Sequence, residues 1–420
     1  MLLLHTSDLH IGSFARHHGL GQLVLEAFER VIDVATREHV DFLLVAGDFF
    51  EKPRFDKFEL LVRVVRKLRE AVEKGVSIVV SPGSHDHVSR GSKGALHLLS
   101  EAGLIKLLEY EERSQKLLLK PLEIEGVKFY GVPGLPNSGE LEYIKSGSLV
   151  FEGLSEGGRK VLLAHTSVKF EGYNPADYSW RYGKVSVVGD EWLSALRSKV
   201  KYVALGHVHY PVPLFKGSRE CFAAYSGAPF GRDLADLKET ADLAKRGFGR
   251  RVLLVDVSGD TAVCTSVDLE LGIEVKELET EYSAVLEREV VKALQEMKSP
   301  HKVLVLRIKG VDLDKRPVVR SKLQELARTV KGAYIVDEVE GLPPYFEVPF
   351  EAPLTTSLRD FDEVKKEIAR EIVKSYGLRI TPEKLLELIE ALSVEDLSSV
   401  YESRIKPILL EIVGAKKVER

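Results

Sequence analysis

The chain has 420 residues, of which 44% are hydrophobic and 30% charged, and its formal net charge at pH 7 is -4. This composition excludes a disordered chain, and the length fits roughly two or three domains of ~150 residues each. Lysine and arginine number 60 against 64 acidic residues, so no general excess of positive charge attracts nucleic acid. Any such contact must come from a local patch or from a metal site.

The two cysteines, Cys221 and Cys264, are too few for a disulfide framework in a chain of this length, so we expect buried thiols in a reducing compartment. The apolar start of the chain is shorter than the ~7–15 residues of a signal-peptide core. No apolar run approaches the ~20 residues of a membrane helix. We therefore expect a soluble cytoplasmic protein. Scarce asparagine, glutamine and methionine beside abundant lysine, arginine and glutamate are typical of hyperthermophile proteins.

Apolar runs alternate with amphipathic stretches in the first part of the chain. Helices are predicted over residues 23–38 and 58–68. Strands are predicted at 2–5, 42–46, 77–80, 127–132, 161–164, 202–205, 222–225 and 252–257. This alternation predicts an α/β fold, and polar residues gather after the carboxyl ends of most of the strands.

The pattern changes after Asp268. Strands at 303–308 and 334–336, with helices around 282–298 and 318–330, predict a small second α/β domain. Glycine and prolines between positions 341 and 353 favour a linker. From Asp360 onward the chain is predicted to be helical, and it carries more leucine and isoleucine than two small helices can bury between themselves. These side chains either dock on the preceding domains or bind a partner.

Five polar clusters directly follow apolar, strand-like runs. In chain order they are Asp8-Leu9-His10, Gly47-Asp48, Gly83-Ser84-His85-Asp86, His165 and Gly206-His207-Val208-His209. Residues two apart in an extended segment point the same way, so both members of an Asp-x-His or His-x-His pair can reach one site. Each pair alone carries little weight, but the joint order of all five argues against chance. Carboxylates and imidazoles at one sheet edge predict a site for manganese, iron or zinc.

This series of motifs resembles the signature of the calcineurin-like metallophosphoesterases. The segments Thr6-Ser7-Asp8-Leu9-His10-Ile11-Gly12 and Ala46-Gly47-Asp48-Phe49-Phe50 are similar in particular to the Mre-eleven/SbcD nucleases of DNA double-strand-break repair. Beyond about Asp268 the resemblance is one of architecture. It implies a metallophosphoesterase core of two packed β-sheets flanked by helices over residues 1–268. A capping, DNA-binding domain over 273–340, a linker over 341–359 and a helical ATPase-binding region over 360–420 would follow.

The same resemblance implies two Mn²⁺ ions per chain, bridged by Asp48, with Mg²⁺, Fe²⁺ or Zn²⁺ as alternatives. Asp8, His10 and His209 would hold one ion. His165 and His207 would hold the other, with Ser84 as a further ligand. His85 would face the scissile phosphate as the catalytic general acid or charge stabiliser.

The chain departs from the family at two positions. Ser84 stands where the family usually has asparagine, and because a hydroxyl binds weakly or holds a water, we expect reduced affinity for the second ion. Glu51 stands where relatives tend to have histidine near the DNA path, so the acidic replacement bears on substrate affinity. Candidate contacts to substrate phosphate are the side chains of Arg90, Lys93, His17 and Arg232, for each of which an ordinary solvated loop residue is the alternative.

The function implied by the resemblance is that of a manganese-dependent DNA nuclease with 3′-to-5′ exonuclease and endonuclease activity at double-strand breaks. It would work with a Rad-fifty/SbcC-type ATPase bound through the C-terminal helices, and a homodimer is expected from the family. A metallophosphatase or small-molecule phosphodiesterase is a second interpretation of the same motifs. A scaffold that couples the ATPase to DNA with impaired cleavage is a third.

Overall fold

The computed structural model describes residues 1–15, 17–54, 58–88, 92–155, 157–178, 187–283, 285–311, 315–339, 366, 369–370, 373, 380–392 and 406–408. Contacts along the chain divide it into two units, Met1–Glu347 and Val348–Arg420. The predicted linker over 341–359 lies outside the described residues, as does most of the predicted helical region over 360–420.

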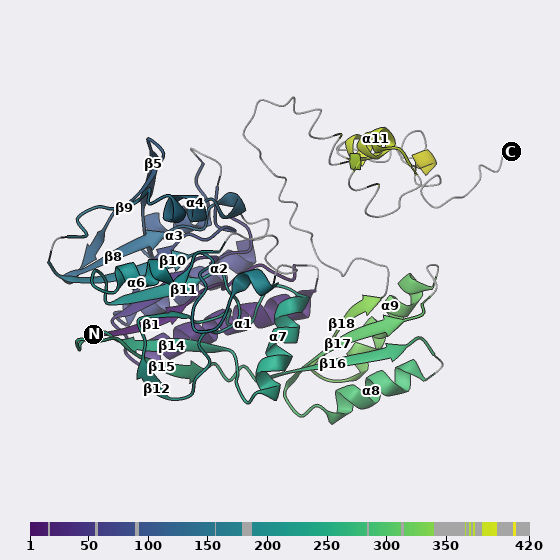
Figure 1. Ribbon diagram of the computed structural model, residues 1–420. Helices are drawn as coiled ribbons and strands as arrows, with labels where there is room; N and C mark the ends of the chain where they lie inside the picture. Colours follow the sequence, from purple (N-terminus) through teal and green to yellow (C-terminus); the bar gives the residue numbers. More distant parts are fainter. Residues whose placement is uncertain are drawn as a thin grey trace. The chain divides into compact units, whose positions relative to one another are not determined.

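Parallel strands from the start of the chain form the centre of the first sheet (Figure 1). Its order is β12 (Ser218–Glu220), β15 (Val263–Asp268), β14 (Arg251–Asp256), β1 (Leu2–Thr6), β2 (Phe42–Ala46), β3 (Ser77–Ser81) and β4 (Lys106–Leu107). β1 to β4 are parallel, whereas β14 and β15 run antiparallel to their neighbours. The carboxyl ends of β1, β2 and β3 therefore meet at one edge of this sheet.

A second sheet repeats this arrangement. Its order is β13 (Ala223–Tyr225), β11 (Tyr202–Gly206), β10 (Arg159–His165), β8 (Val127–Val132) and β7 (Leu122–Ile124). All but β7 are parallel, so the ends of β10 and β11 also share one edge. A small separate sheet consists of β5 (Tyr110–Arg113), β6 (Lys116–Leu119) and β9 (Leu149–Phe151).

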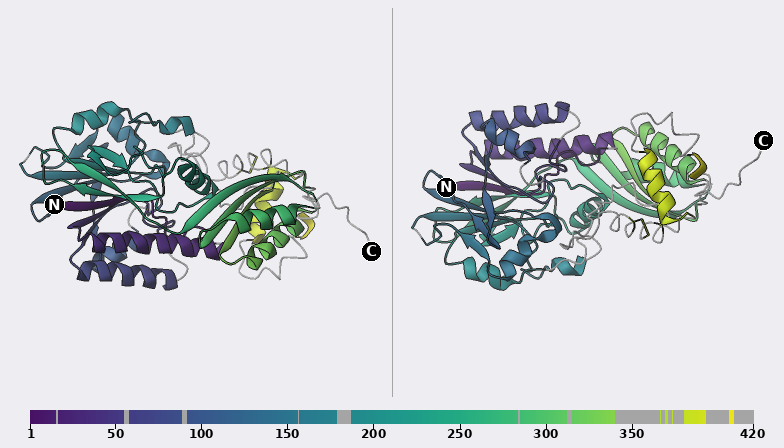
Figure 2. Two further views of the ribbon diagram at one scale, coloured as in Figure 1. Left: turned by 90° about the horizontal axis from the view of Figure 1, so that it is seen from below. Right: turned by 90° about the horizontal axis from the view of Figure 1, so that it is seen from above.

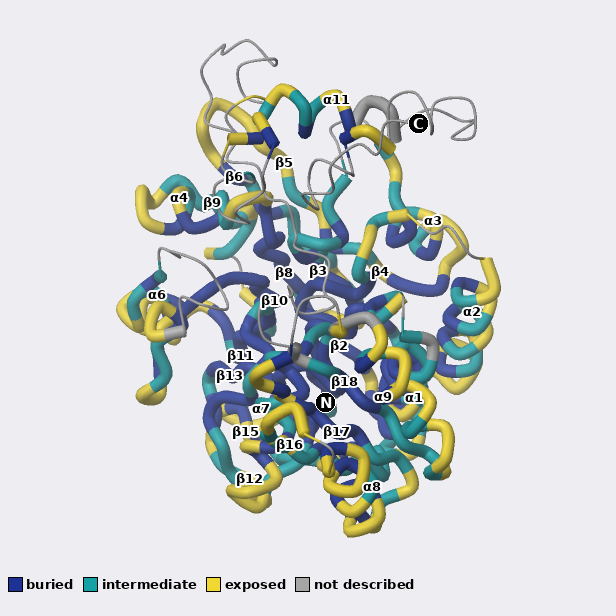
Figure 3. Tube along the Cα trace, turned by 90° about the vertical axis from the view of Figure 1, so that its right-hand side faces the viewer, coloured by how far each residue is buried: buried dark blue, intermediate teal, exposed yellow. Residues whose placement is uncertain are grey.

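The two main sheets pack face to face through apolar side chains. Along β2, Phe42 and Leu44 face the second sheet, whereas Leu43 faces the helices, as the two-residue period of a strand requires. Phe42 meets Phe129 of β8 with ring centroids 4.9 Å apart. Dark blue strands at the centre of Figure 3 show this buried layer.

Helices cover the outer faces of both sheets. The first sheet is covered by α1 (His18–Arg37), α2 (Phe58–Glu73) and α3 (Ala95–Glu101). The second sheet is covered by α4 (Glu140–Lys145) and α6 (Asp190–Leu196), and short 3-10 turns lie at Pro136–Ser138 and Pro175–Tyr178. The predicted core of two packed sheets flanked by helices is confirmed.

A histidine lies inside the layer between the sheets. His5 of β1 is fully buried, and its Nδ1 shares a hydrogen bond of 2.8 Å with the Tyr202 hydroxyl of β11. Burial lowers the pKa of His5 from 6.5 to about 3, because a charged imidazole loses its hydration there.

Stability should therefore fall on the acid side of neutrality. Below pH 6.5 the unfolded chain binds a proton at His5 that the folded chain does not, so the free energy of unfolding decreases until about pH 3. From pH 7 to pH 5, the free energy of unfolding measured in urea should fall by about 2 kcal/mol more for the wild type than for a His5→Gln variant. The exposed His39, replaced by glutamine, is the matched control. An equal pH dependence in wild type and His5→Gln would contradict the assignment.

A third sheet of parallel strands follows β15, which ends at Asp268. It contains β16 (Ile273–Glu281), β17 (His301–Lys309) and β18 (Ala333–Val339), joined by α8 (Leu286–Glu296) and α9 (Arg316–Thr329). One face packs on α8 and α9. The opposite face packs on α1 and on α7 (Leu234–Lys245), where Val303 and Val305 share a core with Leu23 and Leu237. Figure 2 shows α1 and α7 reaching this sheet.

The unit Val348–Arg420 has a small core of its own. α11 (Pro382–Leu392) contributes Leu385 and Leu388, which are buried together with Ala369, Ile380 and Ile408. Among the described residues, every helix is too short or too polar to cross a lipid bilayer.

Candidate metal centre

The loops that follow β1 and β2 run side by side at the sheet edge. The Asp8 N–H donates to the Gly47 carbonyl and the His10 N–H to the Asp48 carbonyl, each at 3.0 Å. Asp8, His10 and Asp48 have φ angles of 53°, 43° and 49°, a left-handed conformation that side-chain-bearing residues rarely adopt. Such strain persists where the surrounding structure over-determines it, and it clusters at functional sites.

Glycines make the close approach of these loops feasible. A Cβ on Gly83 would lie 2.1 Å from Asp48 Oδ1. Gly47 has φ 88°, and a Cβ there would lie 2.1 Å from His165 Nδ1. The Gly-Asp and Gly-Ser-His-Asp motifs thus need glycine because backbone and ligand side chains occupy that space.

The first sheet brings Asp8 and His10 to one side of the cluster. His10 Nε2 lies 3.1 Å from His209 Nε2, and His209 Nε2 lies 3.7 Å from Asp8 Oδ1. The His207 N–H donates to the Asp8 carboxylate at 3.0 Å, which ties the end of β11 to the loop after β1. Donor atoms of Asp8, His10 and His209 lie within 4.8 Å of one another, a spacing at which one ion can be held.

Asp48 lies between this group and the histidines of the second sheet. Its Oδ2 is 3.6 Å from His10 Nε2 and 3.3 Å from His165 Nε2. His165 Nδ1 is 3.0 Å from the Ala46 carbonyl, and the His165 and His207 rings are 5.2 Å apart between centroids. The structure therefore brings all six predicted carboxylate and imidazole side chains together, although Asp8 and His209 lie 201 positions apart in the chain.

The charges of the buried groups depend on one another. Burial alone would raise the pKa of Asp48, but the charges of His165 and His85 hold it well below its ordinary value. Burial would lower the pKa of His165, but the Asp48 carboxylate raises it to about 10. Burial and the charge of His165 lower the pKa of His207 to about 3, so its ring is neutral. Carboxylate and imidazole are the donor set that Mn²⁺, Fe²⁺ and Zn²⁺ accept in proteins, and these residues fit such ions. An ion bound beside Asp48 would take the place of the His165 proton, because a histidine must lose that proton to bind a metal.

The loop after β3 completes the edge. The buried Asp86 accepts hydrogen bonds of 3.0 Å from the N–H groups of Phe49, Phe50 and Gly83, which fixes this loop against the one after β2. Burial, together with the charge of Asp48, raises the pKa of Asp86 to about 7. The His85 N–H donates to Asp48 Oδ1 at 2.8 Å, and Ser84 lies half-buried beside it. Asp86, a member of one of the five polar clusters of the sequence, thus has a structural role that was not predicted.

A second unpredicted residue supports His209. Asp236, fully buried in the first turn of α7, accepts from His209 Nδ1 at 2.9 Å and from the Arg232 N–H at 2.8 Å. The side chain of Asp233 caps the helix by accepting from the Asp236 N–H at 3.0 Å. A carboxylate on the outer ring nitrogen leaves His209 Nε2 to face the cluster. The available sequence signal was the Asp-x-x-Asp start of an amphipathic helix.

His85 stands between Glu51 and Arg232. Its Nδ1 lies 3.1 Å from the Glu51 carbonyl, and its Nε2 lies 2.5 Å from Arg232 Nη1. The Glu51 carboxylate lies 2.9 Å from His10 Nδ1 and 3.4 Å from Arg232 Nη2. Arg232, one of the candidate phosphate contacts, therefore touches the cluster.

The remaining candidate contacts lie elsewhere. His17 approaches Tyr334 of β18 with ring centroids 6.2 Å apart, and burial lowers its pKa. Lys93 lines a groove beside α3. Arg90 lies outside the described residues.

Residues 1–215 match the family model of the calcineurin-like phosphoesterases, which covers half of the chain. The chain belongs to this family. The matched segment of this phosphoesterase holds all six clustered ligand candidates and His85, whereas Arg232 and Asp236 lie beyond it. The predicted family is confirmed.

Curated relatives of this phosphoesterase carry the name DNA double-strand break repair protein Mre11. The chain is 29% identical to that of Saccharolobus solfataricus over 279 residues, which cover 64% of this chain and 63% of the relative. The chain is 29% identical to the protein of Methanopyrus kandleri over 255 residues, which cover 59% of this chain and 53% of the relative. It is 23% identical to the protein of Sulfolobus acidocaldarius over 430 residues, which cover 99% of this chain and 100% of the relative. The chain thus spans less than two thirds of the length of the first two relatives.

Proposed function

We propose that this phosphoesterase is a manganese-dependent DNA nuclease that processes double-strand breaks as an endonuclease and a 3′-to-5′ exonuclease. The observation that carries the proposal is the convergence of buried carboxylates and imidazoles from both sheets beside His85 and Arg232. The name shared by the relatives supports DNA as the substrate.

Each clustered side chain has a proposed role toward two divalent cations. Asp8, His10 and His209 would hold one ion, His165 and His207 the other, and Asp48, placed between the groups, would bridge them. Ser84, directly before His85 in the same loop, would bind the second ion weakly or hold a water beside it. Bound there, the cations would stabilise the attacking and leaving oxygens of a phosphodiester.

His85 and Arg232 would act on the substrate itself. Because His85 Nδ1 faces the Glu51 carbonyl, the Nδ1 atom carries a proton and Nε2 points toward Arg232. In the structure Nε2 accepts from Arg232 Nη1, so Nε2 would gain a proton from solvent when the guanidinium turns to pair with the phosphate, and that proton would then pass to the leaving oxygen. His17 and Arg90 would contact more distant phosphates, whereas Lys93 lines the groove beside α3 that is proposed below as a dimer interface.

The parts beyond the core have proposed roles as well. Residues 1–268 would form the nuclease domain, and residues 273–340 would cap the DNA path. Residues 360–420 would bind a Rad-fifty/SbcC-type ATPase, with 341–359 as the linker. Support for a separate partner-binding region comes from the small core of Leu385, Leu388 and Ile408 within its own unit.

One assay tests the proposed function. The purified chain is incubated with end-labelled duplex and single-stranded DNA in Mn²⁺, in Mg²⁺ and in EDTA. Cleavage of DNA with Mn²⁺ that stops in EDTA is expected. A chromogenic phosphodiester split while DNA stays intact would instead identify a phosphatase or small phosphodiesterase. DNA binding without cleavage of either substrate would identify a scaffold.

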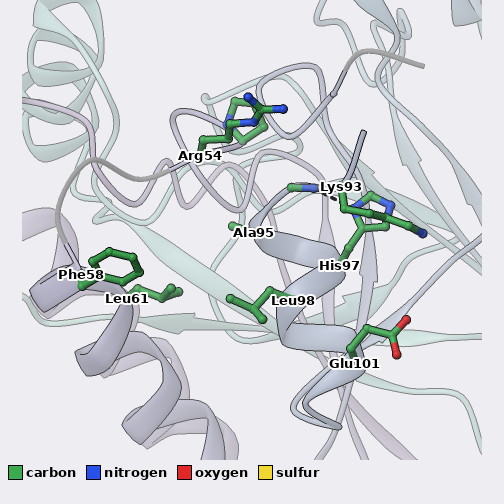
Figure 4. A pocket seen from close by; sticks show the side chains of 10 residues that line it. Arg54, Phe58, Leu61, Lys93, Ala95, His97, Leu98 and Glu101 are labelled. Carbon is green, nitrogen blue, oxygen red and sulfur yellow. Dashed lines mark hydrogen bonds between the residues drawn. The ribbon is translucent and has the colours of Figure 1, made fainter. Parts of the chain in front are cut away.

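We further propose that the chain forms a homodimer through an apolar groove between α2 and α3. Phe58 is 74% exposed, Val62 53% and Leu98 55%. Exposure of these apolar side chains to water is unfavourable, and a second copy of the chain packed on them would bury them. The groove holds about 470 Å³, and Figure 4 shows Phe58 and Leu61 on one side of it and Leu98 on the other.

Charged replacements in this groove should dissociate the dimer. The Phe58→Glu/Leu98→Glu double variant is expected to raise the dissociation constant at least ~100-fold, because two carboxylates would be buried without partners. Analytical ultracentrifugation measures it. Val318→Glu on α9, where Val318 is 67% exposed, is the matched control and should remain dimeric. A double variant that associates like the wild type would place the interface elsewhere.

A further inference from the structure

Glu51 lies inside the site rather than on open surface. Its N–H donates to the Ile11 carbonyl at 3.1 Å, directly after the β-bridge between Phe50 and Ile11. Its side chain is 13% exposed.

One carboxylate oxygen faces a proposed metal ligand. Oε2 lies 2.9 Å from His10 Nδ1, while His10 Nε2 faces His209 Nε2 at 3.1 Å and Asp48 Oδ2 at 3.6 Å. A carboxylate oxygen at this distance favours a proton on Nδ1 through its charge, which leaves the Nε2 lone pair for an ion. Asp236 has the corresponding place beside Nδ1 of His209, where a hydrogen bond forms.

The second oxygen faces the substrate side. Oε1 lies 3.4 Å from Arg232 Nη2 and 3.7 Å from His85 Nδ1. Arg232 thereby keeps its Nη1 at His85 Nε2. The rigid fork of the guanidinium makes such a two-point placement specific.

We infer that Glu51 is a positioning residue that orients His10 through one carboxylate oxygen and holds Arg232 beside His85 through the other. The inference rests on the proposed function, since it assumes that His10 binds an ion and that Arg232 binds phosphate. It gives the acidic replacement in this chain a role within the site, where its charge is balanced, and not along the DNA path.

Calorimetric titration of the full chain with Mn²⁺ tests the first arm without any activity measurement. Glu51→Ala should weaken the affinity for one ion by about 10–100-fold, because His10 loses the oxygen beside Nδ1. Glu51→Gln should stay within about threefold of wild type, since its amide oxygen can take the position of Oε2 beside His10 Nδ1. Glu29→Ala is the matched control: it removes a carboxylate that pairs with Arg63 at 2.8 Å outside the site.

Hydrolysis of a chromogenic phosphodiester tests the second arm. In Glu51→Gln an amide N–H₂ replaces the oxygen that faces Arg232, so kcat/KM should fall about tenfold although Mn²⁺ binding is retained. Wild-type Mn²⁺ affinity in Glu51→Ala, or equal losses in Glu51→Ala and Glu51→Gln, would overturn the inference for His10. Unchanged kcat/KM in Glu51→Gln would overturn the inference for Arg232. This result does not depend on whether Glu51→Ala folds. Failure of the wild type to bind Mn²⁺ would refute the proposed function instead.

Discussion

An Asp48→Asn variant should lose at least about 10³-fold in DNA cleavage, equivalent to about 4 kcal/mol of transition-state stabilisation. Asp48 Oδ2 approaches histidines of both proposed ion sites, at 3.6 Å to His10 and 3.3 Å to His165, and these contacts are closer than the 3.7 Å and 3.9 Å from Asp8 Oδ1 to His209 and His165. An amide of the same shape keeps the packing but removes the negative charge that offsets the repulsion between two cations. The loss of DNA cleavage in Asp48→Asn should therefore exceed the loss in His209→Gln.

Two measurements separate this effect from misfolding. Calorimetry with Mn²⁺ should give two ions per wild-type chain and fewer for Asp48→Asn, and thermal unfolding in EDTA shows whether the variant is folded. Asp33→Asn is the matched control, because Asp33 pairs with Lys67 on the surface outside the site. An Asp48→Asn protein that binds two ions and cuts DNA at the wild-type rate would refute the bridging role.

A His85→Ala variant should lose about 10²–10⁴-fold in cleavage while Mn²⁺ binding stays as in the wild type. This loop is held to Asp48 by a hydrogen bond of 2.8 Å that the His85 backbone N–H donates to Asp48 Oδ1, and alanine retains this N–H. Only the imidazole beside Arg232 is removed, and with it the proposed source of the proton for the leaving oxygen.

The neighbouring His87 supplies the control for this experiment. It is half-buried two residues further along the same loop, and we expect His87→Ala to cut DNA at close to the wild-type rate. Loss of Mn²⁺ binding in His85→Ala would show that His85 acts as a ligand. Unchanged cleavage would remove it from the mechanism.

Sequence reasoning predicted the elements whose apolar pattern is set by burial on both sides. β1, β2, β3, β10 and β11 are continuous apolar runs because the partner sheet covers one face and helices cover the other. The polar clusters after them were placed correctly at one edge because parallel strands end together. That prediction needed only the local order of apolar runs and polar residues, and no knowledge of contacts between distant parts of the chain.

Other parts depend on contacts that local patterns do not encode. β16 was not predicted as a strand, because its charged residues, including Glu277, Glu279 and Glu281, lie on an edge strand that is largely solvated. The contacts of Glu51 with His10 and Arg232 join residues 41 and 181 positions apart. The register of the loops after β1 and β2 brings Glu51 to His10, and the segment between β13 and α7 brings Arg232 to both. Neither contact can be inferred from the spacing of residues along the chain.

The packing of the third sheet on α7 has a mechanical consequence. The helix that meets Val303 and Val305 carries Asp236 in its first turn, and Asp236 accepts a hydrogen bond from the outer ring nitrogen of His209. The same carboxylate accepts from the Arg232 N–H. A shift of the third sheet that displaced α7 would therefore move an imidazole of the cluster together with the arginine beside His85.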